Sequence, residues 1–404
     1  MNATAPLPQR LALFAAPHRL PFLTGAFNLV MLPFWWAGHL AVRNGFALPL
    51  PRHDGLDGAL HGPLTIYALF MPFILGFLST VFPRWMSISD LPPQRFLPPS
   101  LLMALGSVGL ALALWSDRLS VLNLALFLMV CAWSAGAVVL VTVLRAHQKT
   151  ASEPHWHGVS ALTGWMLALG GIAALLAFTW ADWPDGRGWA ILLGTHGLTL
   201  GIFLTVCHRM IPFFAGNAVE AYVRWRPYWL LALLWPLLMA DMVLAWWGVP
   251  WRALTAAALA LLTLLMLWRW TPRRAAPGLL WVLIVGLAWA PVSFALAALA
   301  AAGQVPAIAA THALVLGMGG SLMVAMVTRV TQGHSGRPLT MPAAAWLAFA
   351  AVQGATLLRL GAALRWDALP MLLLPASLLA IGTLPWALRG MMIYLSPRID
   401  GRPG

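Results

Sequence analysis

Long stretches of almost uninterrupted apolar residues recur along the whole chain, separated by short polar segments rich in proline, glycine and arginine. An apolar run of about 18 residues or more is long enough to cross the hydrocarbon core of a bilayer as an α-helix. Backbone N–H and C=O groups in lipid must find partners within the protein, and helices satisfy them within one segment. The pattern therefore predicts an all-α, polytopic membrane protein.

The lengths of the apolar runs predict about twelve transmembrane helices. The predicted ranges are 22–43, 61–82, 99–115, 119–146, 155–180, 188–214, 228–247, 252–269, 278–302, 306–331, 342–361 and 368–394. The longest segments between them, residues 43–60, 83–98 and 209–227, are too short to fold as separate domains. We therefore expect residues 1–404 to form a single integral membrane domain, embedded in the lipid bilayer.

Composition supports this class of protein and excludes others. Hydrophobic residues make up 61% of the chain and charged residues only 9%, with a mean hydropathy of +0.82. The net charge of +13 comes from basic residues scattered through the loops, so nucleic acid is not an expected partner. Most of the 24 Lys and Arg residues fall on the side of the N-terminus, and the positive-inside rule then places both termini in the cytoplasm.

A weak internal repeat links the second, sixth and tenth predicted helices. Each begins near a histidine, namely His61, His196 and His312. Each also has an arginine toward its far end, and all three run in the same direction. A spacing of four helices suggests three four-helix units around a pseudo-threefold axis, and such repeats often place a binding site where they meet.

These three histidines are the best candidates for binding a cofactor. Histidine is uncommon in membrane helices and often functional there. Neutral imidazole is a suitable ligand for haem iron and for copper. His39, near the end of the first predicted helix, is a further candidate metal ligand. The alternative for each histidine is a structural role, in which the ring forms a hydrogen bond with a neighbouring helix.

The other polar residues favour structural roles, and a second site or a proton path is left open for His208. His157 and His208 are expected to lie in the interfacial regions and to pack there, and Arg329 to anchor the topology. Carboxylates are scarce, and only Asp241 lies inside a predicted helix. The sequence has no phosphate-binding loop and no CxxCH haem-attachment motif, so any haem would be bound non-covalently.

Three segments resemble the NnrS family, membrane proteins linked to the nitric oxide response of bacteria. They are His-Ala-Leu…Gly…Arg…Gly-His-Ser-Gly-Arg at 312–337, Arg-Met-Ile-Pro-Phe-Phe at 209–214, and Gly-Phe-Leu…Pro-Arg-Trp at 76–85. Residues 18–22 are also loosely similar to the start of the family pattern. His61 matches the first residue of the family's His-Ala-His-Glu-Met segment, whereas Pro63 and Leu64 differ from it. The layout of the second, sixth and tenth helices also resembles that of haem–copper oxidases and nitric oxide reductase catalytic subunits.

The resemblance implies a protein of the bacterial inner membrane that contains haem b, and in some members copper, and that binds nitric oxide. It further implies a site between the second, sixth and tenth helices, where nitric oxide is reduced or detoxified with electrons from an unknown donor. His61 and His312 are the first axial pair, with His196 as the alternate ligand or a copper ligand.

Two other functions are left open. One is non-enzymatic binding of haem, copper or nitric oxide, and the less favoured one is membrane transport. The glycine-rich helix at 306–331 also leaves a homodimer open, because small residues let helices approach closely.

Overall fold

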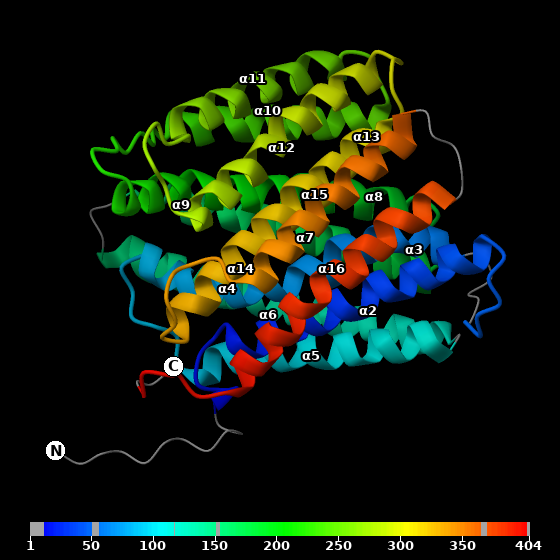
Figure 1. The fold of residues 1–404 in the computed structure, drawn as a ribbon, viewed down its shortest axis with the longest axis horizontal. Coiled ribbons are helices and arrows are strands. Elements are labelled where there is room, and N and C mark those ends of the chain that lie inside the picture. The colour runs from blue at the N-terminus through cyan, green and yellow to red at the C-terminus, as the bar shows by residue number, and fades with distance from the viewer. Residues whose placement is uncertain (1–11, 51–55, 117, 151–153, 365–369, 402–404) are drawn as a thin grey trace.

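The computed structural model describes residues 12–50, 56–116, 118–150, 154–364 and 370–401, and in that part of the chain every regular element is a helix (Figure 1). In chain order they are α2 (Arg19–Arg43), α3 (Leu56–Leu64), η1 (Thr65–Leu69), α4 (Phe70–Trp85), α5 (Pro93–Ser116), α6 (Leu119–Thr150), α7 (Trp156–Trp180), α8 (Gly186–Leu193), η2 (Gly194–Ile202), α9 (Phe203–Ala218), α10 (Trp229–Trp247), α11 (Arg252–Trp270), α12 (Gly278–Ala301), α13 (Ala307–His312), η3 (Ala313–Gly320), α14 (Ser321–His334), α15 (Ala343–Leu364) and α16 (Pro370–Leu395).

Adjoining elements merge into twelve helices of the described chain that are long and apolar enough to cross a membrane. The all-α, twelve-helix prediction is therefore confirmed, and the chain is a multi-pass membrane protein. The predicted third helix was placed at 99–115, but α5 begins at Pro93, and Pro98 and Pro99 lie within it. Pro93 is tolerated as the first residue of this helix, because the N–H that proline lacks would have no partner within the helix at that position. Residues 368 and 369 of the last predicted range lie outside the described residues.

Three of the twelve helices form the core of the bundle. They are the second (Leu56–Trp85), the sixth (Gly186–Ala218) and the tenth (Ala307–His334), the same three that carry the repeated histidines. In their most apolar windows 89%, 83% and 89% of the residues are buried, against 28–67% for the other nine helices. Their apolar side chains therefore face protein on all sides, whereas the remaining helices keep one face for lipid.

Each of the three central helices contains a π-helical segment close to its histidine. Thr65 begins η1, and its hydroxyl donates to the carbonyl oxygen of His61 at 2.8 Å. His196 lies within η2, and His312 immediately precedes η3. π-helical segments are rare and concentrate at functional sites. The three helices therefore share burial and a π-helical segment, and η2 contacts both η1 and η3, in agreement with the repeat in the sequence. A pseudo-threefold arrangement of four-helix units stays a prediction.

The glycines of the tenth helix pack against other helices of the same chain. A Cβ atom added to Gly317 would lie 2.7 Å from the Trp289 ring, and one added to Gly320 would lie 3.2 Å from Val352. These glycines thus allow close packing inside the bundle. The tenth helix is therefore not available as a dimer face, and a homodimer formed through another face stays a prediction.

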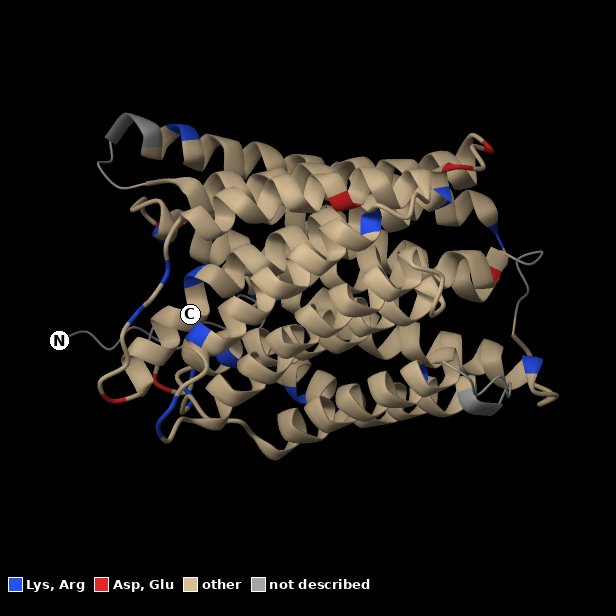
Figure 2. Cartoon of the chain, turned by 90° about the horizontal axis from the view of Figure 1, so that it is seen from above, with Lys and Arg blue, Asp and Glu red and all other residues tan. Residues whose placement is uncertain are grey.

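The start of α2 and the end of α16 lie at the same end of the bundle (Figure 1). The Arg19 guanidinium joins them, because its Nη1 donates to the carbonyl oxygens of Tyr394 at 3.2 Å and Ser396 at 2.7 Å. More Lys and Arg residues lie at this end than at the opposite end (Figure 2). Which end faces the cytoplasm stays a prediction that rests on the positive-inside rule.

Candidate functional site

A cavity of about 320 Å³ lies between the central helices and the first, eleventh and twelfth helices. Its walls are mostly apolar, and its polar groups include two imidazoles, His61 and His312, and two guanidiniums, Arg187 and Arg359. A mostly apolar cavity with a few polar groups is typical of small-molecule and cofactor sites. The cavity is the candidate functional site, and it brings together two of the three histidines that the repeat singles out.

His312 is held by its own helix. Its Nδ1 atom lies 2.9 Å from the carbonyl oxygen of Ile308, one turn earlier. A carbonyl oxygen only accepts, so Nδ1 carries the proton and donates, and Nε2 of the neutral ring keeps a lone pair. Metal-binding histidines commonly have this arrangement, because the hydrogen bond fixes the tautomer and the orientation of the ring. His312 is therefore prepared, both chemically and sterically, to act as a ligand.

His61 is oriented by an aromatic ring instead of a hydrogen bond. Its imidazole stacks on the indole of Trp36 with ring centroids 4.0 Å apart and planes 7° from parallel. Trp36 also lines the cavity. Stacking restricts the tilt of the ring but leaves both nitrogens to the cavity side chains or to a ligand. His61 is consequently held less firmly than His312.

Two arginines supply positive charge to the same cavity. Arg187 donates from Nε to the carbonyl oxygen of Ala59 at 3.0 Å. Arg359 is half-buried, and among the described residues it forms no hydrogen bond or ion pair. A half-buried guanidinium without an anionic partner favours a ligand that carries a carboxylate or another anion. The cavity therefore combines imidazole ligands with an arginine that is free to bind an acidic group.

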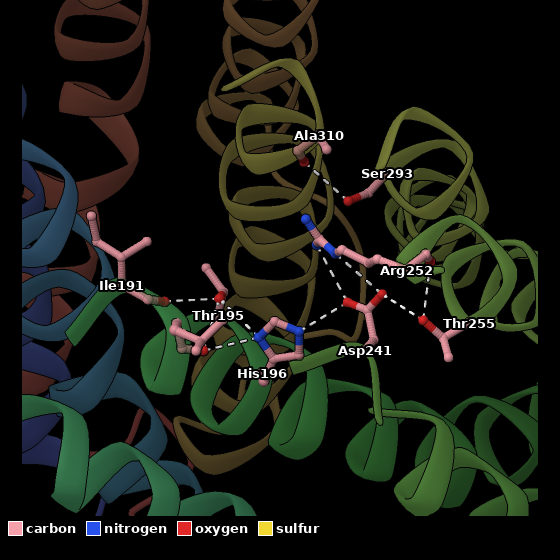
Figure 3. A network of polar contacts seen from close by, with 9 residues as sticks. Ile191, Thr195, His196, Asp241, Arg252, Thr255, Ser293 and Ala310 are labelled. Carbon is pink, nitrogen blue, oxygen red and sulfur yellow. Dashed lines mark hydrogen bonds and ion pairs between the residues drawn. The ribbon is translucent and has the colours of Figure 1, made fainter. Parts of the chain in front are cut away.

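His196 lies outside this cavity, in a separate polar network (Figure 3). Its Nε2 atom lies 3.0 Å from Oδ2 of Asp241, and its Nδ1 atom 2.9 Å from the carbonyl oxygen of Leu192. Arg252 donates to both carboxylate oxygens of Asp241 at 3.3 Å, and the Thr255 hydroxyl donates to Oδ1 at 3.1 Å. The network connects the sixth helix to the seventh and eighth.

The arrangement around His196 leaves neither ring nitrogen free for a metal. Both ring nitrogens lie within hydrogen-bonding distance of protein oxygens, those of Asp241 and Leu192, so neither nitrogen faces an open space where a metal could bind. His39 also has an acidic neighbour, because its Nε2 atom lies 3.4 Å from Oδ1 of Asp57. The Trp35 ring packs against the edge of His39 at 4.9 Å. The structure thus does not bring His196 or His39 into the cavity of His61 and His312.

At the opposite end of the central helices, two histidines that we expected to lie at the interface are buried and joined to each other. His157 Nε2 lies 2.8 Å from His208 Nδ1, and His208 Nε2 lies 3.1 Å from the carbonyl oxygen of Pro227. Helices α7 and α9 pack these faces against each other, so His157 is buried and not part of a basic surface patch, and His208 packs between the helices. Arg329, within the tenth helix as predicted, lies over the Phe214 ring, 3.5 Å from its centroid.

Several residues of the cavity were not predicted as functional. Trp36, Arg187 and Arg359 carry no signal of a shared cavity in the sequence, since six different helices contribute to it.

The residues present fit a haem better than a protein-only metal site. In the described part of the chain no three His, Cys, Asp or Glu side chains lie close enough to hold a metal ion. Haem iron needs only one or two axial ligands from the protein, because the macrocycle supplies the other four. Two cavity histidines, apolar walls and an arginine without a partner among the described residues are the groups that the iron, the porphyrin and a propionate of a haem would require.

The family model described as NnrS protein matches residues 12–398, which is nearly the whole chain. A comparison with curated proteins finds no match.

Proposed function

The chain belongs to the NnrS family, and we propose from this premise that it binds haem b non-covalently between its central helices and acts on nitric oxide. The observation that carries the proposal is the presence of His61 and His312 in one apolar cavity, together with an arginine that has no acidic partner in the described chain. The family's link to the nitric oxide response supplies the substrate. We propose the bacterial inner membrane as its location, with both termini in the cytoplasm.

The two histidines have unequal roles in this proposal. His312 would be the stronger iron ligand, because its hydrogen bond to Ile308 fixes the free lone pair on Nε2. His61 would be the weaker ligand, because only stacking on Trp36 orients its ring. Arg359 would pair with a propionate of the haem.

Bound haem would supply an iron that coordinates nitric oxide and exchanges electrons. The chain's own contribution is to hold the iron, to keep bulk water away by means of the apolar walls, and to tune the iron through its ligands. We propose a redox conversion that removes nitric oxide, with electrons from a separate donor protein. The second candidate function is non-enzymatic binding of haem or nitric oxide. The same cavity supports it equally well, and a measurement of turnover distinguishes the two functions.

Copper is a further metal in this proposal, and His61 and His312, which line the same cavity, would be its ligands. The sequence predicts His39 and His196 as metal ligands as well. In the structure each lies beside a carboxylate, so neither is assigned to the cavity site. A transporter is the least favoured function, since Asp241 is buried and held by Arg252, Thr255 and His196.

The test is an optical spectrum of the purified protein, oxidised, reduced, and reduced in the presence of nitric oxide, together with iron and copper analysis. We expect a Soret band that shifts with nitric oxide and is lost in His312→Ala. In His61→Ala we expect the band to persist with an altered position. His155→Ala is the matched control, because His155 stacks on Trp156 near the opposite end of the bundle. A colourless, iron-free protein from haem-replete cells would overturn the proposal.

A further inference from the structure

A second, smaller pocket of about 40 Å³ adjoins the histidine cavity. It lies between the first helix and the three central helices, and its lining is entirely apolar. Phe70 and Met323 line both spaces, so the two are separated by these side chains. The pocket was not predicted from the sequence, and the histidine site does not account for it.

The shape of the small pocket comes from three phenylalanine rings, each lying against a glycine of a neighbouring helix. Phe70 lies against Gly319, where an added Cβ would be 2.9 Å from the ring. Phe73 lies against Gly25 and Phe22 against Gly76, with corresponding distances of 2.7 and 2.8 Å. The absence of a side chain at these glycines lets the rings draw back.

The small pocket provides no hydrogen-bonding partner for water. A space of about 10–15 Å³ is enough for one water molecule, but the molecule also needs two to four polar partners. Here the volume is sufficient and the partners are absent, since the accessible lining is wholly apolar. Apolar cavities of this kind stay dry and bind small apolar species. All of the lining side chains are buried, including Phe203 and Val327 at its inner wall.

We propose that the pocket lined by Phe22, Phe73, Phe203 and Val327 binds a small, uncharged diatomic gas and passes it to the histidine cavity past Phe70 and Met323. The chemistry that recognises the gas is size and lack of charge, which nitric oxide and dioxygen share. The identity of nitric oxide as the physiological gas rests on the proposed function. Binding of gas to the pocket does not, because no cofactor ligand lines it.

The test uses xenon, an apolar probe of similar size that crystallography detects by its electron density. Crystals of the full chain under xenon pressure are expected to show xenon between Phe203 and Val327. Val327→Phe fills this space and is expected to abolish the xenon peak. Val292→Phe is the matched control, because Val292 lies on an exposed face of α12, and it is expected to keep the peak. Val206→Ile, a milder filling change, is expected to reduce xenon occupancy in case Val327→Phe does not fold.

Competition separates the two gases. Loss of the crystallographic xenon peak when nitric oxide but not dioxygen is added to the xenon atmosphere would assign the pocket to nitric oxide, and loss with either gas would assign it to apolar diatomics in general. Absence of xenon from the wild-type pocket, ordered water or an acyl chain within it, or no competition by either gas would overturn the proposal. A protein that binds xenon here but carries no haem would keep this inference and reject the proposed function.

Discussion

The imidazole of His196 lies 3.0 Å from the carboxylate of Asp241, although these residues belong to the sixth and seventh helices. Because the other ring nitrogen faces the Leu192 carbonyl oxygen, His196 is engaged on both sides by the protein. Of three histidines at equivalent positions in the repeat, two line a cavity and the third joins the central helices to the seventh and eighth. Similar positions in the sequence repeat therefore lead to two different roles, lining a cavity for His61 and His312 and linking helices for His196.

Replacing Asp241 is expected to destabilise the protein without removing the cofactor. Asp241→Ala would leave His196 and the Arg252 guanidinium without their carboxylate, and breaking a buried ion pair costs about 3–5 kcal/mol. We expect a lower midpoint of thermal unfolding in detergent, measured by intrinsic tryptophan fluorescence, and an unchanged ratio of haem to protein in the fraction that stays folded. Asp241→Asn, which keeps an acceptor oxygen, is expected to cost less. Loss of haem from folded Asp241→Ala protein would instead make this network part of the cofactor site.

Arg359→Gln is expected to weaken haem binding while keeping the Soret position. The change removes the positive charge opposite a propionate but neither axial ligand, so the iron environment is preserved. A charge-assisted hydrogen bond contributes about 1.5–3 kcal/mol, which corresponds to a roughly 10- to 150-fold faster transfer of haem to apomyoglobin.

The matched control for Arg359 is Arg118→Gln, because Arg118 is an exposed loop residue away from the cavity. Equal rates of haem transfer from the wild type and from Arg359→Gln would show that Arg359 does not pair with the cofactor.

The helices could be predicted from the sequence because transmembrane hydropathy is a local property. Each predicted range needed only the apolar residues within it, and α10 at Trp229–Trp247 agrees with the predicted 228–247 within one residue. Gly248 adopts a left-handed conformation with φ of 63° at its end, which glycine accommodates without strain. The shared position of His61 and His312 also followed from the repeat, since helices of equal direction place equivalent residues at the same depth.

The partners of polar residues could not be predicted in this way, because they depend on how helices rotate against one another. Asp241 was recognised as an unusual carboxylate, but its contact with His196 requires the relative orientation of two helices. The His157–His208 pair similarly depends on the faces that α7 and α9 present to each other. In the sequence, Arg359 contributes only to the count of basic residues that predicts the orientation of the helices. Its place at the cavity is seen only in the three-dimensional structure.

Gly164→Ala is expected to destabilise the contact between α7 and η2. A Cβ atom at Gly164 would lie 2.7 Å from the carbonyl oxygen of Gly197, and backbone cannot move aside as a flexible side chain does. Overpacking of this kind costs about 1–3 kcal/mol. Gly170→Ala, on the same helix, is the control, because its Cβ would meet only Leu193 at 3.5 Å. Thermal unfolding of both variants should separate them, and equal stability of the two would contradict the close contact.

Stability is expected to fall with acidification through His18, which is 3% exposed and precedes α2. Burial, and then the positive charges of His334 and Arg19, lower the pKa of His18 well below its usual range. The unfolded chain binds a proton at this residue below about pH 6.5, whereas the folded chain does not. Stability is therefore expected to be greatest above about pH 6.5 and to decrease as the pH falls below that value.

His18→Gln is expected to reduce the difference in unfolding midpoint between pH 7.5 and pH 5.5, because the variant has no proton to bind at this position. His155→Gln, a half-exposed histidine before α7, is the control and is expected to keep the wild-type difference. The measurement is thermal unfolding in the same detergent at both pH values. If the His18→Gln variant were as sensitive to acid as the wild type, His18 would accept a proton within the folded protein. It would then do so beside His334, whose ring centroid lies 4.8 Å from that of His18.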